Sequence, residues 1–161
     1  MIVAQTSSDW PGSEAGFGVL KLTALDADDL AVISAQMQDA VIRAGDVKYL
    51  RRANKLVIIA NRFAWDENGA GLQRSYKRHR TGLQFGRVLK VRAHHILQDD
   101  PEAILSLLAI GFAADDEPSG RIMLEFSGGG VLEVTVECIE AALEDLGPVW
   151  DTPHMPSHEG V

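Results

Sequence analysis

The stretch RIMLEFSGGGVLEVTV, residues 121–136, alternates apolar and polar side chains on both sides of a glycine run. The apolar side chains keep one phase before and after the turn: Ile122, Leu124, Phe126, Leu132, Val134 and Val136. Because successive side chains of a strand point to opposite faces, the pattern predicts a β-hairpin with one buried face. The glycines at 128–130 are followed by a strand pattern and not by Lys-Ser/Thr and a helix. We therefore interpret them as the hairpin turn and not as a phosphate-binding loop.

Further strands are expected upstream of this hairpin. In chain order they are a short strand at 19–22, a hairpin of 47–52 and 56–65, a long strand at 83–93, and a buried strand or short helix at 104–112. Each combines β-branched or aromatic residues with a period of two or a short apolar run. Residues 66–80 have no apolar period and are expected to form a polar loop.

Two helices are expected, one on each side of the strands. Asp26 is a typical N-cap, and apolar residues recur at helical spacing after it, which predicts a helix over 27–41. After the last hairpin, the apolar residues within 139–146 have a similar spacing, and Gly147-Pro148 follows them. Glycine and proline commonly end helices, so a C-terminal helix is expected there.

These elements predict an α+β fold. We expect a mostly antiparallel, strongly bent sheet of about six strands with an N-terminal helix and a C-terminal helix. If the last helix closed the sheet, the fold would resemble a pleckstrin-homology-like barrel, an expectation by analogy alone. Residues 20–150 are expected to form a single domain, with a flexible N-terminal arm at 1–19 and a flexible tail at 151–161, because both ends lack an apolar period.

The charge is distributed unevenly along the chain. The 15 basic and 23 acidic side chains give a net charge of −8. Residues 43–92 hold 13 of the basic and three of the acidic side chains, a local balance of +10, so the rest carries −18. Such asymmetry is typical of an anion-binding face, but also of a protein whose basic and acidic surfaces meet within a monomer or across a dimer.

The basic region supplies the candidate binding residues. Four cations and a tyrosine lie within 74–80, a composition that suits phosphate contacts with stacking on a base, or a solvated loop docked on an acidic surface. Arg87 shares the phase of the apolar residues of its strand, which implies an anion or a carboxylate partner, or else a bulge or an edge position that lets its side chain reach solvent. The candidates for contact with an anion or a partner are Arg74, Tyr76, Lys77, Arg78, Arg80, Arg87, Lys90 and Arg92.

Motifs for catalysis or metal binding do not stand out. His94 and His95 are adjacent, so in a strand they point to opposite faces and do not share one ion. The single cysteine, Cys138, excludes an internal disulfide and a cysteine-based zinc cluster. No catalytic residue, metal or cofactor is predicted, and an enzyme is the less favoured class.

Four segments together resemble a known bacterial family. They are LTALD at 22–26, NRFAW at 61–65, LSLLAI at 105–110 and VECIE at 136–140. The family is the domain of unknown function 2948, and the resemblance covers residues 20–150. It implies one compact bacterial cytoplasmic domain and brings no activity, cofactor or catalytic residue with it.

The leading hypothesis is a non-catalytic binding or accessory domain that acts through macromolecular contacts. The alternatives are a small enzyme or sensor that binds an anionic metabolite on the basic face, and a homo-oligomer with pairing basic and acidic surfaces. A protein partner or self-association is favoured over nucleic acid, which the −18 outside the basic region would repel. The chain has no apolar run of about 18 residues and no pattern of a signal peptide, so a cytoplasmic location and no membrane partner are expected.

Overall fold

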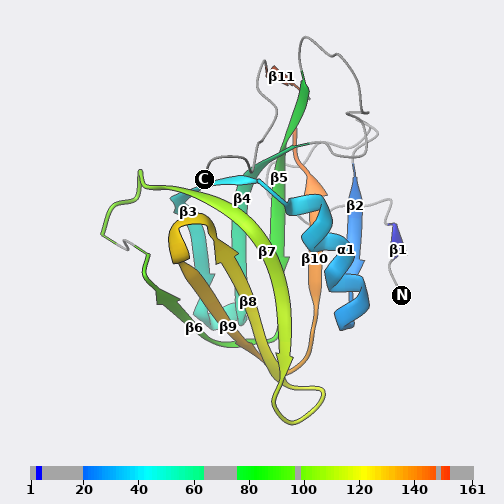
Figure 1. The fold of residues 1–161 in the computed structure, drawn as a ribbon. Helices are drawn as coiled ribbons and strands as arrows, with labels where there is room; N and C mark the ends of the chain where they lie inside the picture. The colour runs from blue at the N-terminus through cyan, green and yellow to red at the C-terminus, as the bar shows by residue number, and fades with distance from the viewer. Residues whose placement is uncertain (1–2, 5–19, 64–75, 97–98, 148–149, 153–161) are drawn as a thin grey trace.

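The described part of the chain consists of one α-helix and eleven antiparallel strands (Figure 1). The computed structural model describes residues 3–4, 20–63, 76–96, 99–147 and 150–152. The elements are β1 (Val3–Ala4), β2 (Lys21–Ala24), α1 (Ala27–Met37), β3 (Val41–Leu50), β4 (Lys55–Phe63), β5 (Tyr76–Phe85), β6 (Val88–His94), β7 (Ile104–Ala114), β8 (Gly120–Phe126), β9 (Val131–Val136), β10 (Ala141–Asp145) and β11 (Trp150–Thr152). Short 3₁₀ turns at Arg51–Ala53 and Ser127–Gly129 join β3 to β4 and β8 to β9.

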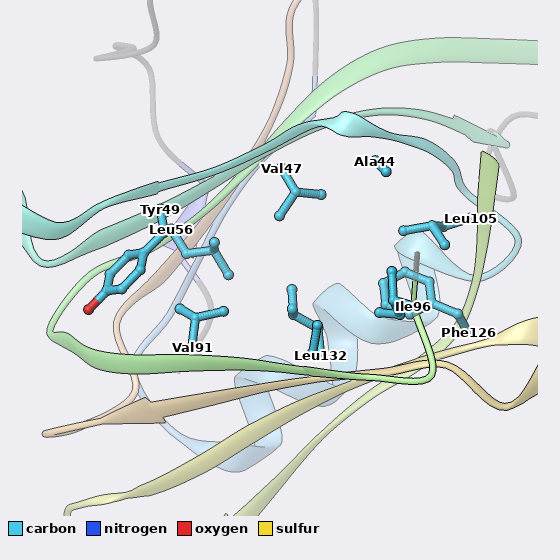
Figure 2. A pocket seen from close by; sticks show the side chains of 10 residues that line it. Ala44, Val47, Tyr49, Leu56, Val91, Ile96, Leu105, Phe126 and Leu132 are labelled. Atoms are coloured by element: carbon cyan, nitrogen blue, oxygen red, sulfur yellow. The ribbon is translucent and has the colours of Figure 1, made fainter. Parts of the chain in front are cut away.

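The strands form one bent sheet that does not close. Its order is β1-β2-β10-β5-β4-β3-β7-β8-β9-β6, with β11 beside β5. The bend falls between β5 and β6, where Arg87 has a φ of 56°, and between β9 and β10. Two backbone hydrogen bonds join these bends, from Gly86 N to Glu140 O (2.8 Å) and from Glu137 N to Arg87 O (3.0 Å). The bend places β6 and β9 opposite β3 and β4 (Figure 2).

The core lies between these two layers of the sheet and continues under the helix. α1 packs mainly against β7 and β2, with Leu30, Ile33 and Met37 buried. Almost every second residue of β8 and of β9 is buried, as an alternating strand requires. Burial of apolar surface by both layers and by α1 therefore holds the bent sheet together.

The predicted fold class is wrong in its strand number and in its last helix. Residues 141–145 are not helical. They form β10, which pairs with both β2 and β5. Ile139, Ala141 and Leu143 are buried with a period of two. The apolar residues of this segment therefore fit the spacing of a strand as well as that of a helix. Residues 139–146 form no helix, and β1 and β6 are unjoined ends within the described residues, so the sheet is not a pleckstrin-homology-like barrel.

Several element boundaries also differ from prediction. α1 ends at Met37 and not at residue 41, because Val41 already belongs to β3. The long strand expected at 83–93 is broken at the bend into β5 and β6. Residues 76–80, expected in a loop, extend β5, whereas 64–75 lie outside the described residues. The arm expected at 1–19 and the tail expected at 151–161 also lie mostly outside them, although β1 pairs with β2 and β11 with β5.

The final hairpin and the N-terminal helix are confirmed. β8 and β9 pair in register, with Ile122 opposite Val134 and Leu124 opposite Leu132. Gly128 and Gly129 adopt φ values of 85° and 91° in the turn, a conformation that side chains other than glycine rarely adopt. Residues 104–114 form a strand, β7, which decides between the strand and the helix that were both expected there.

The cap of α1 gives a test of the helix start. The Asp26 carboxylate accepts a hydrogen bond from the Asp29 backbone N–H (2.8 Å), and this bond lowers the pKa of Asp26 below its ordinary value of 3.8. A lowered pKa in the folded state stabilises the protein above the unfolded-state pKa, and the contribution is lost as the pH falls through the folded-state pKa. We expect Asp26→Ala to lower the free energy of unfolding in urea at neutral pH. The deficit should shrink well below pH 3.8. Asp26→Asn keeps a capping oxygen, so a deficit as large as that of the alanine variant would contradict the capping role.

Candidate functional site: an apolar groove with a basic rim

An apolar groove opens between the two layers of the sheet (Figure 2). In Figure 2, Val47 and Leu56 point into the groove from β3 and β4, and Val91 and Leu132 point into it from β6 and β9. The groove is lined by Ala44, Val47, Tyr49, Leu56, Val91, Ala93, Ile96, Leu105, Phe126 and Leu132. The Tyr49 hydroxyl is the only polar side-chain group among these ten residues. We call this feature the β3–β6 groove.

The size of the β3–β6 groove limits what it can hold. Its volume is about 240 Å³. A cavity of about 150 Å³ holds a benzene ring, whereas sites for drug-sized ligands measure about 300–1,000 Å³. The groove therefore suits one or two apolar side chains better than a whole metabolite.

Two strand edges border the groove. Within the described residues, β6 pairs with β9 alone, and residues 47–50 of β3 pair with β4 alone. The other edge of β6, and the other edge of residues 47–50, has no strand beside it within the described residues. The two edges approach one another at the β3–β4 turn, where Val88 N donates to Asn54 O (2.8 Å). Such edges present backbone N–H and C=O groups that another strand can pair with.

Exposed apolar and basic side chains flank the groove. Leu50 is 47% exposed and Leu89 is 53% exposed, and both lie near the β3–β4 turn. The Arg51 guanidinium carbon lies 5.5 Å from the centre of the Tyr49 ring. Seven basic residues adjoin the lining residues in sequence or follow Tyr49 closely: Arg43, Lys48, Arg51, Arg52, Lys55, Lys90 and Arg92. Five of them are exposed and have no ion pair within the described residues, and we call these the basic rim: Lys48, Arg51, Arg52, Lys90 and Arg92.

The basic rim lacks carboxylate partners in the described residues, unlike other cations of the same chain. Arg43 pairs with Asp46 (3.2 Å) and Glu102 (3.4 Å), and Lys21 pairs with Glu144 (3.4 Å). No rim residue has an ion pair within the ranges that the structure describes. The rim therefore carries positive charge without an ion pair beside an apolar surface, and one carboxylate, that of Glu133, lies opposite Arg92 on β9.

The structure divides the basic residues predicted from sequence into separate places. Lys90 and Arg92 lie on β6 and belong to the basic rim, on either side of the lining residue Val91. Arg87 is not buried as its phase indicated. It lies at the bend, 61% exposed, with its Nε 3.2 Å from a Glu140 carboxylate oxygen. Because the strand is interrupted at the bend, the Arg87 side chain does not point into the core, and it forms an ion pair at the surface.

The other predicted residues lie far along β5 from the groove. Residues 76–78 of β5 pair with β11, and Arg78 also pairs with Phe63 at the end of β4 remote from β6. The half-buried Arg78 guanidinium lies 5.7 Å from the centre of the Phe63 ring, and burial lowers its pKa although Asp39 acts in the opposite direction. Arg80 is exposed, whereas Arg74 lies outside the described residues. The sequence-predicted basic cluster is therefore not one site: Tyr76, Lys77, Arg78 and Arg80 are separated from Lys90 and Arg92.

A buried polar cluster, which the sequence analysis did not identify, is formed by side chains of α1, β4, β5 and β10. Arg62 donates from Nε and Nη2 to the two carboxylate oxygens of Asp145, both at 2.8 Å. His79 Nδ1 lies 3.5 Å from Asp145 Oδ2, and Gln36 accepts from Arg62 Nη1 (3.3 Å). Arg62 and Asp145 are each 1% exposed, so dissolved substrate does not reach them. This cluster joins β4 to β10 across β5 and serves the fold.

The groove, the basic rim and the buried cluster differ in their chemistry. The groove side chains are apolar, the basic rim is exposed, and the most buried ionisable groups are paired with one another. No group of three or more potential metal ligands occurs in the described residues. The described helix has eleven residues, too few to cross a membrane.

Together these features define a small, mainly antiparallel β protein with one helix and an apolar groove. The chain belongs to the family described as "Protein of unknown function (DUF2948)", whose model matches residues 20–158. The match confirms the resemblance and extends it into the tail. No curated protein and no solved structure matches the chain significantly.

Proposed function

We propose that this protein is a non-catalytic binding domain whose β3–β6 groove receives apolar side chains of a protein partner. One observation carries the proposal: a groove of about 240 Å³ lined by apolar side chains lies next to exposed leucines and exposed cations. Exposed apolar surface rimmed by polar residues is typical of interaction sites. The proposed location is the bacterial cytoplasm, where a free thiol such as that of Cys138 is ordinary.

A metabolite site is supported less well. Sites for small anionic ligands place several polar groups inside the pocket to orient the ligand. The β3–β6 groove offers only the Tyr49 hydroxyl from a side chain, and the cations of the rim are exposed. A solvated cation contributes little to holding a single small anion, whereas several such cations along an edge suit an extended partner.

Site-specific photo-crosslinking in the native host tests the proposal. Tyr49 is replaced by p-benzoylphenylalanine, which keeps an aromatic ring in the groove. The matched control carries the same group at Val32, which is 43% exposed on α1 and does not line the groove. We expect a discrete crosslinked protein from position 49 alone. The product should disappear when Ala93→Trp fills the groove.

Two results would overturn the proposal. One is identical crosslinked products from positions 49 and 32, which would show capture without regard to the groove. The other is no product from position 49 in cells that hold the folded variant.

A further inference from the structure

The free edge of β6 and the apolar groove lie in the same place. Residues 90–94 of β6 pair in register with residues 131–135 of β9 on one side. On the other side no strand is present within the described residues. Val91 and Ala93 point their side chains into the β3–β6 groove, and the alternate residues Lys90 and Arg92 are exposed. The edge thus offers backbone hydrogen-bonding groups, an apolar floor and positive charge together.

From this juxtaposition we propose that β6 binds an extended acidic segment of the protein partner as an added β-strand. The inference rests on the proposed function and specifies the partner's chemistry. An added strand pairs its backbone with the edge of β6, which supplies affinity, while side-chain pockets supply specificity. Five residues of β6 span about 17 Å at the strand rise of about 3.3 Å per residue, so the core of the partner segment is about five or six residues long.

The period of two fixes the chemistry of that segment. Every second side chain of the added strand faces the groove, where the lining of Val91, Ala93 and Leu132 favours an apolar residue. The intervening side chains face the side where Lys90 and Arg92 are exposed, which favours glutamate or aspartate. Opposite charges across neighbouring strands stabilise the pairing, and like charges oppose it. The partner segment therefore alternates apolar and acidic residues.

A different reading of the same cations is that they keep the edge from pairing with anything. Natural proteins often place lysine and other charged residues on edge strands for that purpose. Protection alone does not account for the exposed Leu50 and Leu89 beside the edge, or for an apolar groove left open next to it. The two readings differ in one outcome, since a protected edge binds no peptide.

The test measures fluorescence anisotropy of labelled peptides with the full chain. The probe is an eight-residue peptide of alternating glutamate and leucine with blocked ends. A peptide with lysine in place of glutamate controls for charge. Two isomers with backbone N-methyl groups, on the glutamates only or on the leucines only, control for strand pairing. Because alternate N–H groups of a strand face one edge, we expect one isomer to bind about tenfold more weakly and the other to bind almost as tightly as the parent peptide.

A matched pair of variants locates the site. Arg92→Glu reverses one charge of the basic rim, and Arg80→Glu reverses another exposed charge, which lies on β5 outside the groove. Arg80→Glu should melt like the parent, because an exposed charge contributes little to stability. Arg92→Glu faces Glu133 on β9, and like charges in register are destabilising, so this variant should remain folded but melt slightly lower. We expect Arg92→Glu to weaken binding of the acidic peptide about five- to tenfold at low salt, with a smaller loss at high salt, and Arg80→Glu to change it less than twofold.

The outcomes separate the inference from the proposed function. No binding of the acidic peptide, equal binding of both N-methylated isomers, or equal effects of the two variants overturns strand addition. Tighter binding of a single-stranded RNA of equal length, with the same dependence on Arg92, overturns it in favour of nucleic acid. If these results coincide with a specific crosslink from position 49, the groove still binds a protein and only the strand mode fails.

Discussion

Asp145→Leu is expected to lower the free energy of unfolding by about 3–5 kcal/mol, because it removes the carboxylate that accepts two hydrogen bonds from the buried Arg62 guanidinium. Arg62 and Asp145 are each 1% exposed and are joined by two hydrogen bonds of 2.8 Å. At that depth water does not replace the two hydrogen bonds that the Asp145 carboxylate accepted, so their loss is costly. Urea unfolding followed by circular dichroism measures the loss.

Two further variants show whether loss of the ion pair between Arg62 and Asp145 is the cause. Arg62→Met with Asp145→Leu removes both charges, and we expect it to recover a large part of the loss. Recovery stays incomplete, since Asp145 also accepts from Leu20 N (3.3 Å). Arg87→Ala breaks an exposed pair and should cost less than about 1 kcal/mol. A loss for Asp145→Leu as small as that for Arg87→Ala would contradict the account of the buried pair.

The parts of the fold that were predictable are those with local signals. The 121–136 hairpin combines a period of two with a glycine turn, and the start of α1 has a capping aspartate, so neighbouring residues alone specify each element. Residues 139–146 differ because their apolar side chains fit both periods, and alanine, leucine and glutamate favour helices. Pairing with β2 and β5, which lie far away in sequence, decided for a strand. Such pairing is not visible in a local pattern.

The candidate site was predictable only in its charge. Lys90 and Arg92 were identified as cations on a strand, and they do lie in the basic rim. The groove lining comes mainly from β3, β4, β6, β7, β8 and β9, and the bending of the sheet at residues 86–87 and between β9 and β10 brings these strands together. The buried pair did leave a signal. Arg62 continues the buried phase of Leu56, Ile58 and Ala60 on β4, and a charged residue in that phase requires a partner.

The largest loss is expected from Val134→Asp, on the strand with the clearest sequence signal. Val134 is completely buried, opposite Ile122 on β8 and Val91 on β6. An aspartate there buries a carboxylate among apolar side chains with no cation in register, and the cost should exceed about 4 kcal/mol, enough to unfold a domain of ordinary stability. Val134→Ala keeps the site apolar and should cost about 2 kcal/mol through the cavity that it leaves. Thermal melting of all variants gives the comparison.

Thr135→Asp is the matched control, because it places the same carboxylate one residue further along the same strand. The side chain of Thr135 points to the opposite face, and its cross-strand partners are Lys90 and Arg121. Two cations in register favour an acidic residue, so Thr135→Asp should leave the melting temperature unchanged or raise it. Comparing the melting temperatures of the two aspartate variants shows whether the loss depends on the face of the strand or on the carboxylate itself. Cooperative melting of Val134→Asp within a few degrees of the parent would mean that position 134 is not in the core. The apolar face of the 121–136 hairpin would then not be its buried face.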